Sequence, residues 1–176
     1  LKEEWTDGKL KVTHENYQPV MAVPYDMYIS GYDTDAVNKL VLWSAKSPNN
    51  LDMTAFSRGE YVRSLEENTM AEVISKILYP ADDHIEGKRL RIKQQYLLVS
   101  ASLQSILLKH IKKYKTLDNL PDKVAIHIND THPALCVPEL TRILIDEYGY
   151  DWDKAWDIVT RTLTYTNHTV MSEALE

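Results

Sequence analysis

The segment VAIHINDTHP, residues 124–133, decides the fold class of this chain. Residues 124–128 are apolar except for His127, and a short apolar run of this kind is typical of a parallel strand covered on both faces. Polar residues follow directly, where the strand is expected to end. The segment TLTYTNHT, residues 162–169, repeats this order with a β-branched run and a polar loop. Two such strands predict an α/β fold with a parallel sheet.

Helices are predicted before and between these strands, because apolar residues recur there every three to four positions. The predicted helices cover residues 57–78, 88–114 and 138–148, and a further helix begins after Asp151. Gly149 closes the third helix and Asp151 caps the fourth. The second helix is the longest, with a length of roughly 40 Å at 1.5 Å per residue.

The N-terminal part of the chain is predicted to be β-rich. Residues 9–14 alternate between polar and apolar side chains, as in a half-buried strand, and residues 38–45 are a second strand candidate. Between these two segments, residues 20–23 and 25–29 form further apolar stretches that Pro24 separates. A proline there predicts an edge strand or a break in the strand. We expect part of one domain over residues 1–176, with a β-rich region at 9–48, a helical region at 57–114 and an α/β region at 122–176.

The composition excludes several classes of protein. The 176 residues are 44% hydrophobic and 26% charged, which is ordinary for a globular domain and unlike disordered or collagen-like chains. A net charge of −6 argues against a nucleic-acid partner. The sequence has no apolar run of the ~20 residues that a membrane span needs. The single cysteine, Cys136, fits a reducing compartment, and we therefore expect a cytoplasmic location.

The two polar loops are the first candidate site. Ligands of open parallel sheets bind outside the carboxyl ends of the strands, so neighbouring strands would bring Asp130, His132 and His168 to one crevice. A carboxylate and two imidazoles there can bind a metal, perform acid–base chemistry or hydrogen-bond a polyol. Two alternatives stay open on the residues alone. Asp130 can be a helix cap, or His127, Asp130 and His132 can form the metal site of a hydrolase.

A second polar cluster lies between the first two predicted helices and consists of Asp82, Asp83 and His84 with Glu86 and Gly87. It can serve as a gate or a substrate loop. It can equally be a solvated connection, because acidic residues also favour the N-terminus of the helix that follows.

Several motifs point to one family. They are VMAVPYD at 20–26, LWSAK at 42–46, LYP at 78–80, INDTHP at 128–133, YTNHT at 165–169 and EALE at 173–176. In this order and spacing the motifs resemble those of the α-glucan phosphorylases, which act on glycogen, starch or maltodextrin. The resemblance covers the chain from about Lys9 onward.

The resemblance implies a part of the N-terminal half of a two-domain glycosyltransferase with Rossmann-like, parallel-sheet layers. Such enzymes use phosphate to release glucose 1-phosphate from the non-reducing end of an α-1,4-glucan. Their cofactor is pyridoxal phosphate, which is held on a lysine that this chain does not contain. We therefore expect the chain alone to be inactive. The resemblance also implies a cytoplasmic homodimer that pairs through the helix after Ser57.

The same resemblance implies roles for individual residues. His168 matches the histidine that contacts the reacting glucose through its ring and its backbone carbonyl. Asp130 and His132 match positions beside the sugar, and Asn167 matches a substrate-binding position. A second region matches the gate over the entrance to the active site, which contains Tyr79, Asp82, Asp83 and His84. Tyr79 corresponds to an aromatic residue that can stack on the glucan, and the two acids face the catalytic site.

The gate departs from the family pattern. Many members have Asn-Asp-Asn where this chain has Ala81, Asp82 and Asp83. The second asparagine becomes an acid, which keeps an acceptor and loses a donor. A non-catalytic structural or interaction module remains the alternative to an enzyme.

Overall fold

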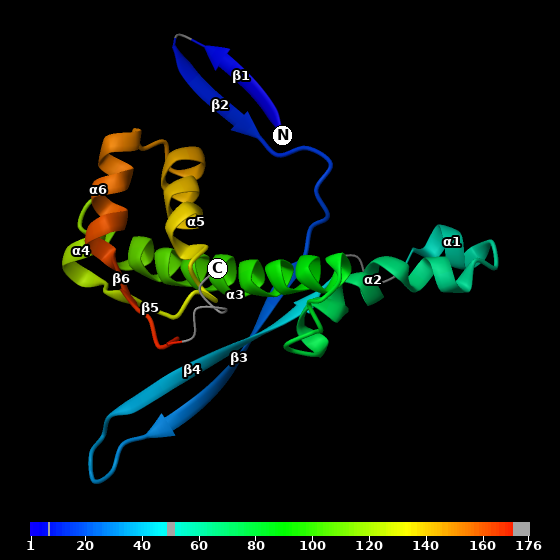
Figure 1. Ribbon diagram of the computed structural model, residues 1–176, viewed down its shortest axis with the longest axis horizontal. Helices are drawn as coiled ribbons and strands as arrows, with labels where there is room; N and C mark the ends of the chain where they lie inside the picture. The colour runs from blue at the N-terminus through cyan, green and yellow to red at the C-terminus, as the bar shows by residue number, and fades with distance from the viewer. Residues whose placement is uncertain (7, 49–51, 171–176) are drawn as a thin grey trace. The chain divides into compact units, whose positions relative to one another are not determined.

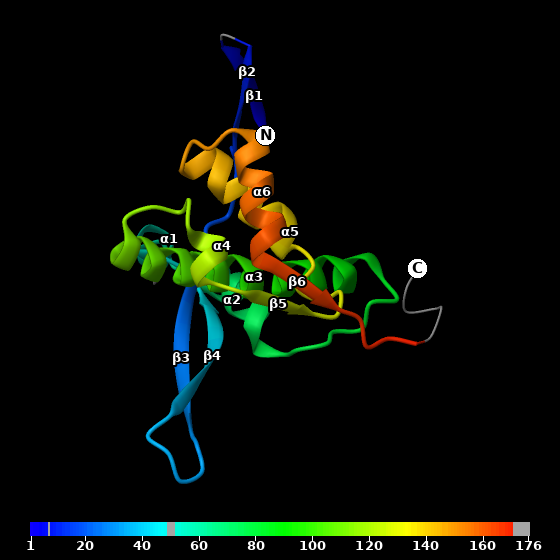
Figure 2. The same cartoon turned by 90° about the vertical axis from the view of Figure 1, so that its left-hand side faces the viewer.

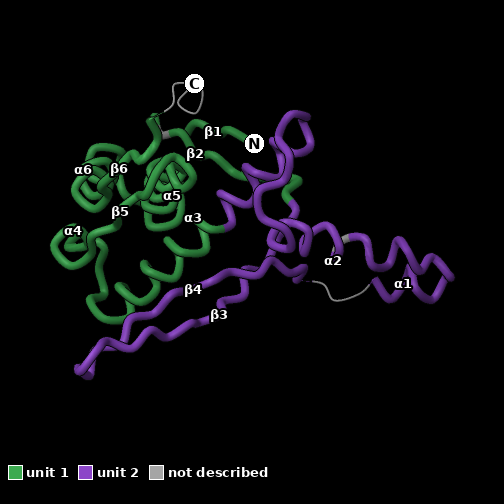
Figure 3. Tube along the Cα trace, turned by 60° about the horizontal axis from the view of Figure 1, so that its bottom comes forward, with its two compact units in different colours: residues 1–17, 98–176 green, residues 18–97 purple. Residues whose placement is uncertain are grey.

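The computed structural model describes residues 1–6, 8–48 and 52–170 (Figure 1). The chain divides into two units, one formed by residues 1–17 and 98–176 and the other by residues 18–97 (Figure 3). The long helix α3 (Ile85–Tyr114) contributes residues to both. We describe each unit by itself.

The unit of residues 18–97 contains an antiparallel hairpin. Strands β3 (Met21–Ser30) and β4 (Val37–Lys46) pair from Met21 opposite Lys46 to Ser30 opposite Val37. The sheet has two strands, so both are edge strands, and Pro24 lies within β3 opposite Trp43. The predicted edge strand is therefore confirmed.

The helix predicted over residues 57–78 is present over residues 61–76, and a short helix that was not predicted precedes it. Helix α1 (Met53–Ser57) begins after Asp52, whose Oδ1 accepts hydrogen bonds from two backbone N–H groups at 3.0 Å. The helical conformation is interrupted at Gly59, which has a φ of 81°. Helix α2 (Tyr61–Lys76) follows. A left-handed glycine ends a helix, and the spacing of apolar residues does not register it.

Helix α2 packs against the hairpin, since the Ser75 hydroxyl accepts a hydrogen bond from the Ala45 backbone N–H at 2.8 Å. The next helix, α3, begins three residues before the predicted start. The reason is local. The Nδ1 atom of His84 accepts a hydrogen bond from the Gly87 N–H at 3.0 Å and so satisfies a donor of the first turn.

The other unit contains the hairpin of β1 (Lys2–Thr6) and β2 (Lys9–Thr13), of which β1 was not predicted. After α3 come α4 (Leu120–Lys123) and β5 (Ile126–Asn129). Then follow α5 (Cys136–Arg142), the π-helix η1 (Ile143–Glu147), α6 (Trp152–Thr162) and β6 (Leu163–Thr166).

Strands β5 and β6 are parallel neighbours, as the sequence predicts (Figure 2). The predicted helix over residues 138–148 begins earlier, at Cys136, and its second half is the π-helix. Gly149 ends this helical stretch with a φ of 73°. Asp151 caps α6, because its Oδ1 accepts a hydrogen bond from the Lys154 N–H at 2.8 Å. The predicted roles of Gly149 and Asp151 at the ends of these helices are therefore confirmed.

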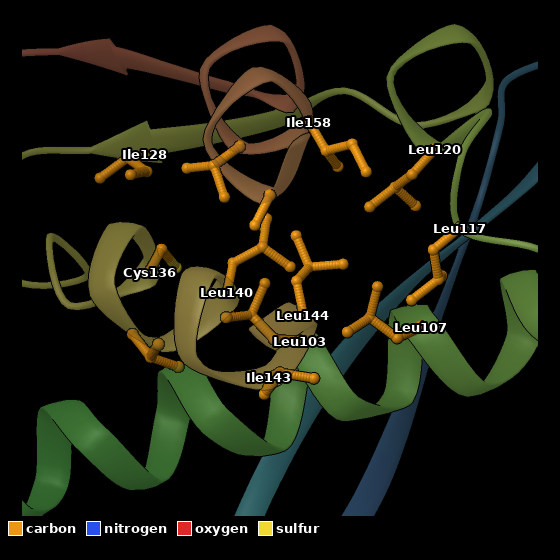
Figure 4. Packing of buried hydrophobic residues seen from close by; sticks show 13 residues of the cluster. Leu103, Leu107, Leu117, Leu120, Ile128, Cys136, Leu140, Ile143, Leu144 and Ile158 are labelled. Atoms are coloured by element: carbon orange, nitrogen blue, oxygen red, sulfur yellow. The ribbon is translucent and has the colours of Figure 1, made fainter. Parts of the chain in front are cut away.

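The hydrophobic core of this unit lies between α3, α5, η1 and α6 (Figure 4). Its buried members are Val99, Leu103, Leu107, Leu117, Leu120, Ile128, Cys136, Leu140, Ile143, Leu144, Ala155, Ile158 and Val159. Each fully buried leucine or isoleucine contributes about 1.5–3 kcal/mol to stability. Burial raises the pKa of the Cys136 thiol to about 11, with a smaller contribution from the charge of Glu139.

Each sheet formed by the described residues has two strands. The chain is thus a mixed α/β protein, and the Rossmann-like layered architecture remains a prediction. Within the described part of the chain, no helix combines the length and apolarity needed to cross a bilayer.

Candidate functional site

The ends of β5 and β6 bring the two polar loops together. Asn129 pairs with Thr166 at the last position of the parallel register. One residue later, the Asp130 N–H donates a hydrogen bond to the Thr166 carbonyl at 2.9 Å. The loops therefore start side by side at one edge of the sheet.

Asp130 connects the two loops directly. Its Oδ1 atom accepts a hydrogen bond from the backbone N–H of His168 at 2.9 Å and another from the hydroxyl of Thr169 at 3.3 Å. Asp130 is half-buried and has a φ of 64°. This left-handed conformation is uncommon for any residue except glycine, although aspartate tolerates it better than most. The condition of neighbouring strands is met, and Asp130 and His168 lie together, whereas the convergence of His132 on the same crevice remains a prediction.

The loop after β6 is also stabilised by hydrogen bonds between its own residues. The Asn167 side chain accepts a hydrogen bond from the Thr169 N–H at 2.9 Å and donates one to the Thr169 carbonyl at 3.1 Å. The His168 side chain between them is exposed. His132 is also exposed, in the turn between Asp130 and α5. An imidazole on a loop held in this way can hydrogen-bond a hydroxylated ligand or transfer a proton.

His127 takes part in a different arrangement. Its Nδ1 atom lies 2.9 Å from the hydroxyl oxygen of Thr164, and its Nε2 atom lies 2.7 Å from that of Thr166. Both ring nitrogens thus bond across the parallel strand pair. Over residues 1–6, 8–48 and 52–170, no group of three or more His, Cys, Asp or Glu side chains is placed to hold a metal ion. The alternative metal site of His127, Asp130 and His132 has no geometric support.

A buried ionic cluster holds α5 to α3 behind the loops. The Glu139 carboxylate is 4% exposed and accepts hydrogen bonds from Arg142 Nε at 2.8 Å and from the Ser100 hydroxyl at 2.7 Å. Buried charges require such partners, because an unpaired carboxylate in an apolar interior is very costly. The sequence signals the pair Glu139 and Arg142 through its i,i+3 helix spacing, but nothing local signals Ser100.

The second polar cluster belongs to the other unit. Tyr79 is exposed with a φ of 55°, and residues 79–84 lead from it to α3. We call residues 79–84 the gate segment. Gln94 Nε2 donates a hydrogen bond to the Ile77 carbonyl at 2.7 Å, just before the segment. The side chain of Asp83 is 85% exposed, and its nearest basic group is His84 Nε2 at 4.0 Å.

Several contacts within this unit hold the gate segment to the first turns of α3, and the hydrogen bond from the Gly87 N–H to His84 Nδ1 is one of them. Asp82 forms an ion pair with Arg91 at 2.5 Å. Gly87 is buried, and a Cβ atom there would lie 1.7 Å from the Ala81 carbonyl oxygen. The predicted polar cluster includes Gly87 but not Arg91. A Gly near a helix start is the only local signal for the close approach.

The comparisons with known proteins agree on one family. Residues 2–176 match the carbohydrate phosphorylase family. The chain is 50% identical over 170 residues to a glycogen phosphorylase of Pasteurella multocida, an alignment that covers 97% of this chain and 21% of the relative. It is 49% identical over 168 residues to the muscle form of human glycogen phosphorylase, covering 90% of this chain and 20% of the relative. A glycogen phosphorylase of Haemophilus influenzae is 47% identical over 170 residues, covering 97% and 21%.

The chain spans about a fifth of the length of these relatives. The match nevertheless includes both polar loops and the gate segment, since it runs from residue 2 to residue 176. On this ground the chain belongs to the carbohydrate phosphorylase family.

Proposed function

We propose that this chain is part of an α-1,4-glucan phosphorylase, which releases glucose 1-phosphate from the non-reducing end of a glucan by reaction with phosphate. The proposal rests on the family match together with one observation, the hydrogen bond between Asp130 Oδ1 and the His168 N–H at 2.9 Å. That contact joins the two motifs that resemble the sugar-binding loops of the family. The chain would therefore supply one part of the sugar pocket.

In this proposal His168 contacts the reacting glucose. Cleavage of a glycosidic bond proceeds through an oxocarbenium-like transition state, which gains from a fixed dipole beside its developing positive charge. The ring and the carbonyl of His168 would supply polar contacts of this kind. Asp130, His132 and Asn167 would form the edge of the same pocket.

The gate segment would bind or admit the glucan. Tyr79 offers an exposed aromatic ring for stacking on a sugar, and Asp82, Asp83 and His84 offer hydrogen-bonding groups. The ion pair with Arg91 compensates the charge of Asp82 in this conformation. The pair uses Oδ2 of Asp82, and Oδ1 would remain to accept a hydrogen bond from a sugar hydroxyl.

Pyridoxal phosphate, which the family implies, does not fit the loops of this chain. The segments 124–137 and 163–170 contain no lysine that could hold the cofactor as a Schiff base. The chain alone would then lack phosphorolytic activity, and the complete polypeptide would have to supply the cofactor site. We further propose a cytoplasmic location and a homodimer that pairs through α2, the helix after Ser57.

The test is an assay of the complete polypeptide with maltoheptaose and phosphate. We expect glucose 1-phosphate to form, and we expect His168→Ala to lower kcat/KM by on the order of 10²-fold, as for loss of a positioned polar contact. This chain assayed alone should give only the buffer rate. Failure of the complete polypeptide to form glucose 1-phosphate would refute the function, whereas a near-wild-type rate for His168→Ala would refute only the role of that residue.

A further inference from the structure

The two peptide groups on either side of His168 are each held by a different side chain. The peptide that carries the His168 N–H donates to Asp130 Oδ1 at 2.9 Å. The next peptide carries the Thr169 N–H, which donates to Asn167 Oδ1 at 2.9 Å. Because a peptide unit is planar, the second bond also sets the direction of the His168 carbonyl, which belongs to the same plane.

Holding both peptide planes fixes the backbone of His168. The only soft rotations between the two planes are φ and ψ of that residue. With both planes hydrogen-bonded, these angles are set, and so is the direction in which the Cα–Cβ bond points. The exposed imidazole then has only its own side-chain rotations left.

Asp130 is itself attached at several points. Its N–H binds the Thr166 carbonyl, and its Oδ1 binds both the His168 N–H and the Thr169 hydroxyl. These contacts follow the neighbouring loop from the end of β6 to Thr169. A non-glycine residue with a φ of 64° persists where surrounding contacts determine its conformation. The contacts of Asp130 explain why it is held there.

We infer that Asp130 and Asn167 are positioning residues, which fix the backbone of His168 and so aim its carbonyl and imidazole at the ligand. The inference rests on the proposed function for what His168 does in the reaction. It assigns to Asp130 and Asn167 a task different from acid–base chemistry or substrate binding. Asp130 Oδ1 accepts from the His168 N–H of the neighbouring loop, and Asn167 Oδ1 accepts from the Thr169 N–H of its own loop.

A pair of variants at Asp130 separates the hydrogen bond from the charge. Asp130→Asn keeps an oxygen acceptor and a residue that tolerates a left-handed backbone. Asp130→Gly keeps that backbone conformation and removes the acceptor. In the complete enzyme we expect Asp130→Asn to lower kcat by a few-fold, since a charge-assisted hydrogen bond becomes a neutral one. We expect Asp130→Gly to lower kcat by about 10²-fold, similar to His168→Ala.

The combination with His168→Ala adds a second criterion. If Asp130 acts through His168, the losses of Asp130→Gly and His168→Ala should be less than additive in the double variant, because the imidazole is then lost only once, while Asp130→Gly still releases the carbonyl of residue 168. The pH profile of Asp130→Asn should keep the limbs of the wild-type profile. A loss as large in Asp130→Asn as in Asp130→Gly, or a missing limb, would show that the carboxylate acts on the substrate and would overturn the inference.

Hydrogen exchange provides a readout that does not depend on activity. Measured at single-residue resolution in the complete protein, exchange at the His168 amide should accelerate at least about tenfold in Asp130→Gly, because a hydrogen-bonded amide becomes free. Exchange at the Thr169 amide should accelerate likewise in Asn167→Ala, which leaves Asp130 unchanged. Unaltered exchange at both amides would overturn the inference, even if the enzyme proves to be a phosphorylase. Accelerated exchange in an inactive complete protein would refute the proposed function and leave the positioning role intact.

Discussion

The loop that carries His168 and the gate segment both contain polar candidate residues, but they are held by different kinds of contact. The His168 loop follows a strand whose neighbouring helices enclose a buried core, and side-chain oxygens bind its backbone. The gate segment is exposed and is held to α3 by an ion pair, by a close approach to Gly87 and by one side-chain to backbone hydrogen bond, from the Gly87 N–H to His84 Nδ1. The first arrangement suits a group that must stay in place, and the second suits a segment that can be displaced.

The largest effect is expected from the core that supports the His168 loop. Leu140 on α5 is 0% exposed and lies within the cluster between α3 and α6. Leu140→Ala should lower the free energy of unfolding by about 2–5 kcal/mol, through lost apolar burial and a residual cavity. Urea unfolding of the purified protein would measure it.

Leu108→Ala is the matched control, because Leu108 on α3 is 63% exposed. Its effect should stay within about 0.5 kcal/mol, as for most surface substitutions. Equal losses in the two variants would mean that the cluster does not form the core in solution.

An intermediate effect is expected where the gate segment meets α3. Ala at an interior helix position normally improves on glycine by about 0.8–1 kcal/mol. At Gly87 the new Cβ atom would meet backbone atoms, namely the Ala81 carbonyl oxygen at 1.7 Å and the Asp82 Cα at 3.2 Å. Gly87→Ala should therefore cost about 1–3 kcal/mol, as overpacking does, and should make residues 79–84 more sensitive to limited proteolysis.

Lys93→Ala is the control for a substitution by alanine at an exposed position of the same helix. It should leave proteolysis at residues 79–84 unchanged. If Gly87→Ala instead raised the melting temperature with no new cleavage, the close packing of the gate segment on α3 would be wrong.

The elements that the sequence predicts well are those with a local cause. Apolar periodicity and the capping residue Asp151 predict the helices of the second half, and the rule that ligands bind at strand ends predicts that Asp130 and His168 meet. The helix predicted over residues 57–78 is present as α2, but it begins four residues later, because apolar spacing does not register the left-handed Gly59 before it.

The contacts that define the two candidate sites have no local pattern. The bond from Asp130 to His168 joins residues 38 positions apart, and the ion pair of Asp82 with Arg91 joins residues nine apart across a turn. Their geometry depends on how the strands and helices pack. For the same reason the sequence indicates His127 as a possible metal ligand, whereas the parallel register places threonine hydroxyls at both of its ring nitrogens.

The smallest effect is expected from the ion pair of the gate segment. The side chains of Asp82 and Arg91 are 51% and 31% exposed, so the pair contributes about 0–1 kcal/mol, as exposed pairs do. Asp82→Asn should lower the melting temperature slightly in low salt. The loss should shrink at high ionic strength, where exposed charges are screened over distances of roughly 3 Å at 1 M salt. In a double-mutant cycle with Arg91→Gln, the coupling should account for most of the loss.

Asp83→Asn decides between this ion pair and a simpler explanation. Acidic residues before a helix also interact with its dipole, a contribution of about 0.3–1 kcal/mol, and Asp83 lies closer than Asp82 to the start of α3 at Ile85. A dipole effect would make Asp83→Asn cost at least as much as Asp82→Asn. The ion pair predicts instead a measurable loss for Asp82→Asn and almost none for Asp83→Asn, because the Asp83 side chain is 85% exposed. Phosphate KM, measured for both variants of the complete enzyme, then tests the gate. If releasing Arg91 displaces the gate segment, Asp82→Asn alone should change KM, and equal KM values would mean that this pair does not control entry to the site.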